Sequence, residues 1–139
     1  MLDNYRDLID ELLGAPKALR DLLGSADPLP SAATRLLADL RDRDTAVLAR
    51  LQTMTREHGV FLPVAVDIPG PASDGAALLD EFDTARGELV SLLMNLTLRD
   101  WERTAIDATA GEITVADEVE RHVEFDEAQR ERLGRAIGG

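Results

Sequence analysis

The chain has 139 residues, no cysteine and a formal net charge of −12, from 27 Asp and Glu against 15 Lys and Arg. The missing cysteines exclude thiolate zinc sites, iron–sulfur clusters and thiol nucleophiles. The negative charge repels phosphate groups, so we expect neither nucleic acid nor a membrane surface as a partner. The length and the 45% of hydrophobic residues indicate one domain, residues 1–139. Because no signal peptide or membrane-length apolar run is present, we expect a cytoplasmic protein.

Four segments have apolar residues at helical spacing, and none has the alternation that a sheet requires. The sequence therefore predicts an all-α fold, a four-helix bundle. The first helix is expected from Asp3 to about Gly24. Gly14 and Pro16 interrupt its pattern, which predicts a break or a kink near Ala15.

The second helix is expected to run to about His58, with Ser31 as its N-cap. The connection from Gly59 to Ser73 contains several prolines and predicts no regular structure. At about 3.3 Å per residue this connection spans roughly 50 Å, which lets the third helix start parallel to the second. A bundle with one long crossover is therefore an alternative to a simple up-down-up-down arrangement.

The third helix is expected from Asp74 to about Leu96, followed by a short helical turn within residues 97–103. Trp101, the only tryptophan, lies in that turn, where a large ring is expected to plug one end of the bundle. After a stretch of small residues, Thr114 and Asp117 resemble a capping box. A fourth helix is expected to follow over residues 115–136.

Polar residues on the inner faces of the helices are the candidates for chemistry. On the fourth helix His122, Asp126 and Gln129 interrupt an apolar stripe, and the first two form an i,i+4 pair that can share a metal or a hydrogen bond. If the stripe is rotated by one residue, His122 lies at the flank as an ordinary hydrogen-bonded or half-exposed histidine, and both interpretations remain open. On the second helix Asp44 lies nearest the inner stripe, where an ion pair with an arginine such as Arg86 is expected.

Several stretches resemble the DinB/YfiT-like superfamily. The run from Leu37 to Leu51 is similar to the second helix of that family. Trp101 to Arg103, Gly111 to Val115 and Val123 to Gln129 are similar, in the same order, to its Trp element, its Gly-x-hydrophobic-Thr element and its His-Asp-x-x-His element. The resemblance implies a four-helix bundle with up-down-down-up topology and a long crossover between helices 2 and 3.

The resemblance also implies where a metal would bind. Family members typically hold a divalent metal through one His on the second helix and two on the last, and some are thiol-dependent transferases or isomerases. In this chain those positions fall on Asp39, Phe125 and Gln129. Phe cannot bind a metal and Gln is a poor ligand for zinc or nickel, so the resemblance implies a degenerate site.

Three hypotheses follow for function. The first is a non-catalytic protein without a cofactor that binds a small molecule or a protein and forms a homodimer. The second is a hydrolase or thiol S-transferase whose site is rebuilt from Asp39, His122, Asp126 and Gln129 and binds Zn, Ni, Mn or Fe. The third is an interaction domain whose acidic surface meets a basic partner. Since the chain has two histidines, any metal centre would consist largely of carboxylates.

Overall fold

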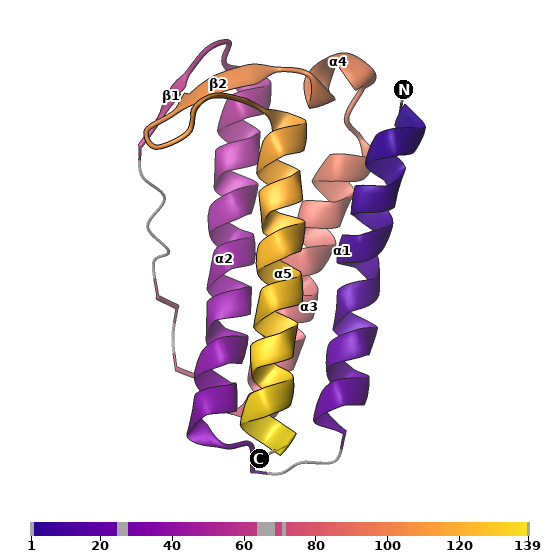
Figure 1. Ribbon diagram of the computed structural model, residues 1–139, viewed down its shortest axis with the longest axis vertical. Coiled ribbons are helices and arrows are strands. Elements are labelled where there is room, and N and C mark those ends of the chain that lie inside the picture. The colour runs from indigo at the N-terminus through magenta and orange to yellow at the C-terminus, as the bar shows by residue number, and fades with distance from the viewer. Residues whose placement is uncertain (1, 25–27, 64–68, 71, 139) are drawn as a thin grey trace.

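The computed structural model describes residues 2–24, 28–63, 69–70 and 72–138. Four long helices form a bundle: α1 (Leu2–Leu23), α2 (Ser31–Arg56), α3 (Gly75–Met94) and α5 (Val115–Gly138) (Figure 1). The short helix α4 (Leu98–Trp101) and the strands β1 (Phe61–Leu62), β2 (Thr104–Asp107) and β3 (Gly111–Thr114) lie at one end of it. The predicted four-helix bundle is confirmed. Within the described ranges, no helix has both the length and the apolar composition needed to span a membrane.

Helices α2 and α3 run in the same direction. Arg41 contacts Glu81 and Asp44 contacts Arg86, so the contacts advance together along both helices. In the connection between the two helices, the backbone amide of Gly70 donates to a residue of α2, Asp42. Helices α1 and α5 run in the opposite direction (Figure 1). This arrangement brings all four helices to one shared core.

The small sheet differs from the sequence prediction. Strand β2 pairs with β1 in parallel and with β3 in antiparallel orientation, and β1 lies in the connection that was predicted to be irregular. Strands of two or four residues are too short for an alternating pattern to stand out. The turn between β2 and β3 is closed by Asp107, which accepts hydrogen bonds from the amides of Thr109 and Ala110. Gly111 ends the turn with a φ of 79°, which favours glycine.

Two predictions about helix boundaries are wrong. A break or a kink was predicted near Ala15, and the break is absent, because helix α1 is continuous through Ala15 with Pro16 inside it. Ser31 is the first residue of α2, and Pro30 takes the N-cap position without a side-chain hydrogen bond. Proline suits a helix start because an amide hydrogen at this position would have no partner within the helix, so its absence costs nothing.

Other local predictions are confirmed. Thr114 and Asp117 form the capping box, with each side chain accepting from the backbone amide of the other residue. Trp101 is 1% exposed at the end of the bundle. Its ring stacks on that of Tyr5, with centroids 4.7 Å apart and planes 8° from parallel. The ring therefore closes the core beneath the sheet, as expected for a single tryptophan in this position.

The buried core consists of two apolar clusters with charged residues between them. The cluster nearer the sheet includes Leu51, Leu89, Trp101, Ile113 and Val119. The other includes Leu19, Leu37, Leu40, Phe82 and Leu133. Between them on α2, α3 and α5 lie four buried polar side chains, which we call the polar layer: Asp44, Arg86, His122 and Asp126.

Candidate functional site

Arg86 is the centre of the polar layer. Its Nε and Nη2 atoms donate to the two oxygens of Asp44 at 2.8 and 2.9 Å, and Nη2 also donates to Oδ1 of Asp126 at 2.7 Å. Each of these three side chains is at most 2% exposed. The paired bonds to Asp44 have the two-pronged geometry that suits a guanidinium and a carboxylate. One cation from α3 therefore binds carboxylates from both α2 and α5, and the Asp44–Arg86 ion pair expected from the sequence is confirmed.

His122 completes the layer from α5. Its Nε2 atom lies 2.6 Å from Oδ1 of Asp44, whereas its Nδ1 atom is buried without a hydrogen-bond partner. With a neutral imidazole, the layer holds two carboxylates and one guanidinium and has one excess negative charge. The layer is thus a buried network in which one polar atom, Nδ1 of His122, has no hydrogen-bond partner.

Pro16 supplies the layer with a further acceptor. Proline has no backbone N–H, so the carbonyl of Leu12, four residues earlier in α1, cannot accept the usual helical bond. Nη1 of Arg86 donates to this carbonyl at 2.8 Å. This contact was not predicted from the sequence, although a proline inside an apolar helix marks a carbonyl that needs another donor.

The charges of the layer stabilise one another. Burial by itself would raise the pKa of Asp44, but the hydrogen bonds and charges of His122 and Arg86 outweigh it and lower the pKa below its ordinary value. Burial likewise opposes the charged form of Arg86, yet Asp44 and Asp126 raise its pKa further above the ordinary range. The carboxylate and the guanidinium therefore stay ionised inside the core.

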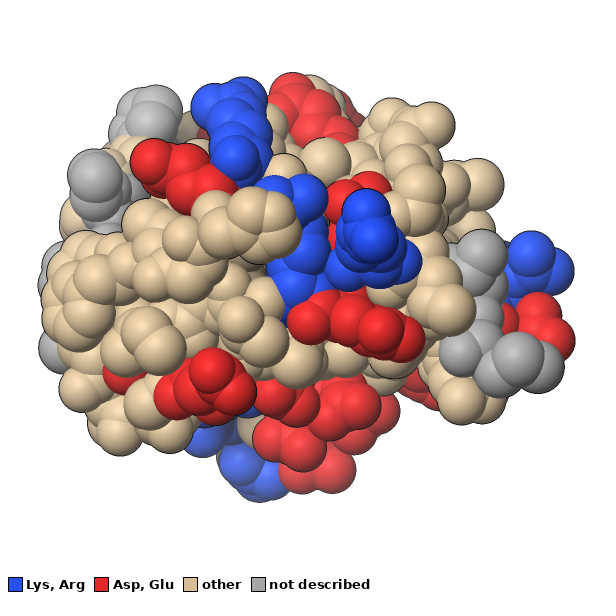
Figure 2. Space-filling model, turned by 90° about the horizontal axis from the view of Figure 1, so that it is seen from above, with Lys and Arg blue, Asp and Glu red and all other residues tan. Residues whose placement is uncertain are grey.

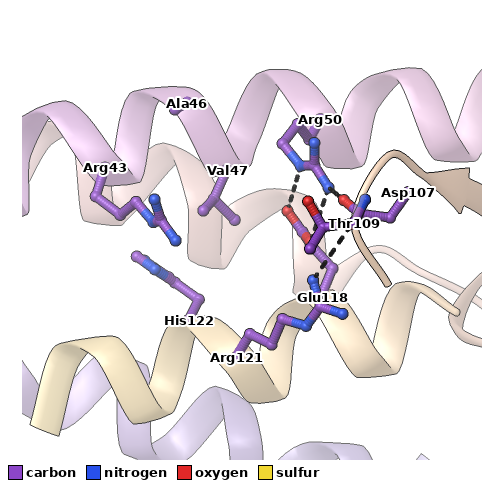
Figure 3. A pocket seen from close by; sticks show the side chains of 9 residues that line it. All are labelled: Arg43, Ala46, Val47, Arg50, Asp107, Thr109, Glu118, Arg121 and His122. Carbon is purple, nitrogen blue, oxygen red and sulfur yellow. Dashed lines mark hydrogen bonds and ion pairs between the residues drawn. The ribbon is translucent and has the colours of Figure 1, made fainter. Parts of the chain in front are cut away.

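A pocket of about 140 Å³ lies beside the polar layer, between α2, α5 and the turn after β2 (Figure 3). His122 belongs to both the layer and the pocket wall. The lining consists mostly of polar and charged side chains: Arg43, Arg50, Asp107, Thr109, Glu118, Arg121 and His122, with Ala46 and Val47. The pocket is therefore a polar space that reaches the buried network through one histidine.

Three of the charged residues in the pocket wall bind one another. Arg50 donates to Glu118 at 2.6 Å and to Asp107 at 2.7 Å. The backbone amide of Ala110, together with Arg50, lowers the pKa of Asp107 to about 2. These bonds attach the β2–β3 turn to α2 and α5, so this part of the wall has a structural role.

Phe125 contacts two further residues of the pocket wall, Arg43 and His122. Its ring centroid lies 4.9 Å from Cζ of Arg43, a cation–π contact. Its ring also lies nearly parallel to that of His122, with centroids 6.3 Å apart. In Figure 3 the guanidinium of Arg43, on α2, points toward His122, on α5. The aromatic ring thus fixes a cation and an imidazole that face each other across the pocket.

The four residues predicted as metal ligands do not all come together. His122, Asp126 and Gln129 are buried on the inner face of α5. The interpretation that placed His122 at the flank is therefore wrong about its position, whereas the hydrogen bond that it expected is present. Gln129 donates to a backbone carbonyl of α2 outside the polar layer. Asp39 lies on the exposed side of α2. Five residues advance a helix by about 140° beyond a full turn, so Asp44 faces the core where Asp39 does not.

The comparisons with known proteins bear on the fold. No family model and no curated protein sequence matches the chain. Solved structures do match, among them YfiT from Bacillus subtilis, with a TM-score of 0.73 over 96% of this chain and 87% of that chain. The chain has a YfiT-like fold. The neighbour is described as a probable metal-dependent hydrolase with an unusual four-helix bundle topology, and the two sequences are 17% identical. At that identity the match confirms the fold implied by the resemblance, and function depends on the site.

The polar layer draws one side chain from the second helix and two from the last, as the resemblance implies for a metal site. The group that they surround is the guanidinium of Arg86. Asp44 comes from α2, and His122 and Asp126 come from α5 at i,i+4 spacing. Arg86, however, already binds both carboxylates. Within the residues described, no group of three or more Asp, Glu or His is placed to hold a metal ion. A divalent cation does not fit these side chains as arranged, because it would compete with a buried guanidinium for the same oxygens.

Proposed function

We propose that this chain is a non-catalytic, metal-independent binding protein with a YfiT-like fold. The observation that carries the proposal is the position of Arg86, whose guanidinium binds Asp44 and Asp126 together. A guanidinium cannot act as a Lewis acid or activate a water molecule as a bound metal does. In this proposal the guanidinium of Arg86 neutralises the two buried carboxylates that a metal would otherwise bind.

The pocket beside the polar layer is the proposed binding site. Its volume of about 140 Å³ is below the roughly 300 Å³ at which sites for drug-sized ligands begin. A small molecule is therefore the class of ligand that fits. Nδ1 of His122, buried without a partner, supports this proposal because a ligand atom could pair with it.

Metal content tests the proposal directly. Protein purified without a chelator or a metal affinity tag should contain far less than one equivalent of zinc, nickel, manganese or iron by elemental analysis. Near-stoichiometric metal that disappears in His122→Ala would overturn the proposal. His58→Ala is the matched control, because His58 is the second histidine of the chain and is exposed.

A metal-dependent hydrolase or thiol S-transferase is the second candidate. It is supported by the spacing of His122 and Asp126 and by the description of the neighbour as a probable metal-dependent hydrolase. This function requires Arg86 to leave the two carboxylates. Crystals soaked in Mn²⁺ would show anomalous density between Asp44, His122 and Asp126 if this candidate is right, and none there if the first proposal is right.

We also propose that the chain forms a homodimer. Phe61 and Ile106 are register partners on β1 and β2, and both side chains are exposed. Figure 2 views the sheet end of the bundle and shows a broad area without charged side chains, with Asp and Glu gathered along its lower edge. Exposed apolar side chains such as Phe61 and Ile106, set in a surface without charges, support self-association. Light scattering should give twice the mass of the chain, and a monomer at every concentration would contradict the proposal.

A further inference from the structure

The charged side chains around the pocket already have partners. Arg50 binds Asp107 and Glu118, and Arg121 lies 4.0 Å from the same Asp107. Arg43 packs over an aromatic ring of α5 and has a further interaction of its own. An ion that enters the pocket would have to compete with these partners for every contact. The wall therefore favours a neutral ligand over an anion or a cation.

His122 has one ring nitrogen that no other group uses. Its Nε2 atom lies 2.6 Å from Oδ1 of Asp44. Burial opposes the charge of Asp44, but His122 and Arg86 lower its pKa below the ordinary value, so this carboxylate has no hydrogen to donate. The hydrogen of the contact therefore belongs to Nε2. In a neutral imidazole with that hydrogen, Nδ1 is an acceptor.

This acceptor lacks a donor. Nδ1 of His122 is buried without a hydrogen-bond partner, although buried polar atoms are nearly always paired. The ring extends from α5 toward α2 and forms part of the pocket wall (Figure 3). A ligand that suits this wall therefore needs a hydrogen-bond donor.

The size and the apolar part of the pocket restrict the ligand further. The volume of about 140 Å³ is close to that of an engineered cavity of roughly 150 Å³ that binds benzene. Ala46 and Val47, on α2, give the wall an apolar part that hydrocarbon atoms can contact. A small molecule with one donor and a short hydrocarbon chain matches both properties.

We propose that the pocket binds a short-chain alcohol, whose hydroxyl group donates to Nδ1 of His122 and whose hydrocarbon part packs against Ala46 and Val47. The proposal rests on the proposed function and adds the chemistry of the ligand. An ammonium group would also donate to Nδ1, but it would add a cation beside the three arginines of the wall. A hydroxyl group supplies the donor without a charge.

Butan-1-ol is the probe that tests this proposal. It is added to the full chain in buffers cleared of metal with a chelating resin, and the imidazole nitrogens of both histidines are followed by NMR. The free chain should show His122 with a hydrogen on Nε2 and none on Nδ1. Titration should give a saturable shift of Nδ1 in His122 and none in His58, which is exposed. A hydrogen on Nδ1 in the free chain, or no saturable shift, would refute the site.

Two further probes test the chemistry of the ligand. Diethyl ether is an isomer of butan-1-ol that has an oxygen acceptor but no donor, and it should bind about tenfold more weakly. Ether that binds as tightly as the alcohol would show that Nδ1 receives no hydrogen bond and would overturn the proposal. Butyrate tests the charge, and binding of butyrate as tight as that of butan-1-ol would refute the assignment to a neutral ligand.

A pair of variants tests the location. Ala46→Leu fills the space with hydrocarbon and should weaken binding of butan-1-ol about tenfold or more. Ala49→Leu is the matched control, because Ala49 is an exposed alanine of the same helix, and its affinity should equal that of the parent chain. Thermal unfolding of each variant shows that it folds. Equal affinities of both variants and the parent chain would place the alcohol outside the pocket and refute the proposal.

Metal analysis of the same samples separates this inference from the proposed function. Metal-free protein in which butan-1-ol shifts Nδ1 of His122 supports both. Metal-free protein that does not respond refutes the inference and leaves the proposed function standing. Protein with one equivalent of metal that is lost in His122→Ala overturns the proposed function, and with it the inference, since His122 would then be a metal ligand.

Discussion

Nε2 of His122 lies 2.6 Å from Oδ1 of Asp44, which also accepts a hydrogen bond from Arg86. This contact joins the last helix to the second at the level where the two apolar clusters meet. Charges in such a position stabilise the fold only while each has its partners, because an unpaired charge inside the core is far more costly than a complete set. Removal of single members of the polar layer should therefore have large and specific effects.

Arg86→Met should lower the free energy of unfolding by about 3–5 kcal/mol, since it leaves two buried carboxylates without their cation. Urea denaturation at pH 7 measures the change. Arg99→Met is the control, because Arg99 is exposed on α4 and its replacement should change stability by no more than about 0.5 kcal/mol.

A repaired variant identifies the cause of that loss. Arg86→Met combined with Asp44→Asn and Asp126→Asn removes the two charges that Arg86 neutralises. We expect the combined variant to recover a measurable part of the lost stability, because neutral amides are less costly to bury than unpaired carboxylates. If it is no more stable than Arg86→Met alone, lost packing of the long side chain is the cause instead.

Loss of the guanidinium should also create a metal site. In Arg86→Ala, the side chains of Asp44, His122 and Asp126 keep oxygen and nitrogen donors without the competing cation. We expect Zn²⁺ or Mn²⁺ to raise the midpoint of thermal unfolding of Arg86→Ala, by an amount equivalent to about 2.7 kcal/mol when the free metal is a hundredfold above its Kd. The parent chain should not respond, and the further change His122→Ala should abolish the effect. Equal stabilisation of the parent chain would contradict the prediction.

Acid should weaken the attachment of the β2–β3 turn. The pKa of Asp107 is lowered to about 2 from its ordinary value of 3.8, so the unfolded chain binds more protons than the folded chain between these pH values. Stability from this residue is therefore present above about pH 4 and is lost as the pH falls toward 2, by about 2 kcal/mol in total. Asp107→Asn should be less stable than the parent chain at pH 5, and urea denaturation should show the gap narrowing by pH 2.5. A constant gap would show that the charge of Asp107 is not the cause.

The stacked pair at the sheet end offers an optical test. Tyr5→Ala should lower stability by about 1–3 kcal/mol and shift the emission of Trp101 to longer wavelength, because the indole ring loses its stacked neighbour. Fluorescence is specific here since the chain has one tryptophan. Tyr5→Phe keeps a ring in place and should behave like the parent chain. An unchanged spectrum in Tyr5→Ala would mean that the stacking does not shield Trp101.

Helical periodicity was sufficient to predict most of the fold. The apolar stripes of four long segments gave the bundle, and the position of Asp44 on such a stripe gave its pairing with Arg86. A charged residue that faces a core needs a partner of opposite sign, and this rule can be applied to the sequence alone. The strands were missed because two to four residues cannot show a period, and their pairing depends on segments distant in the chain.

The candidate site was predicted in part. His122 and Asp126 are neighbours on one helix, so their spacing alone placed them together. Their partner on α2 was assigned to Asp39 through a similarity of sequence, whereas the rotation of the helix brings Asp44 inward. The pocket was not predicted, because its wall joins α2, α5 and a turn whose positions are set only when the core packs.

Pro16 ties the folding of α1 to the rest of the chain. An internal proline costs a helix about 3 kcal/mol, and here the carbonyl that it leaves open is completed by Arg86 of another helix. A peptide of residues 2–23 alone would lack this donor and should form little helix. In the intact chain, α1 cannot detach without exposing both that carbonyl and the buried guanidinium, so it should open together with the whole core in amide hydrogen exchange.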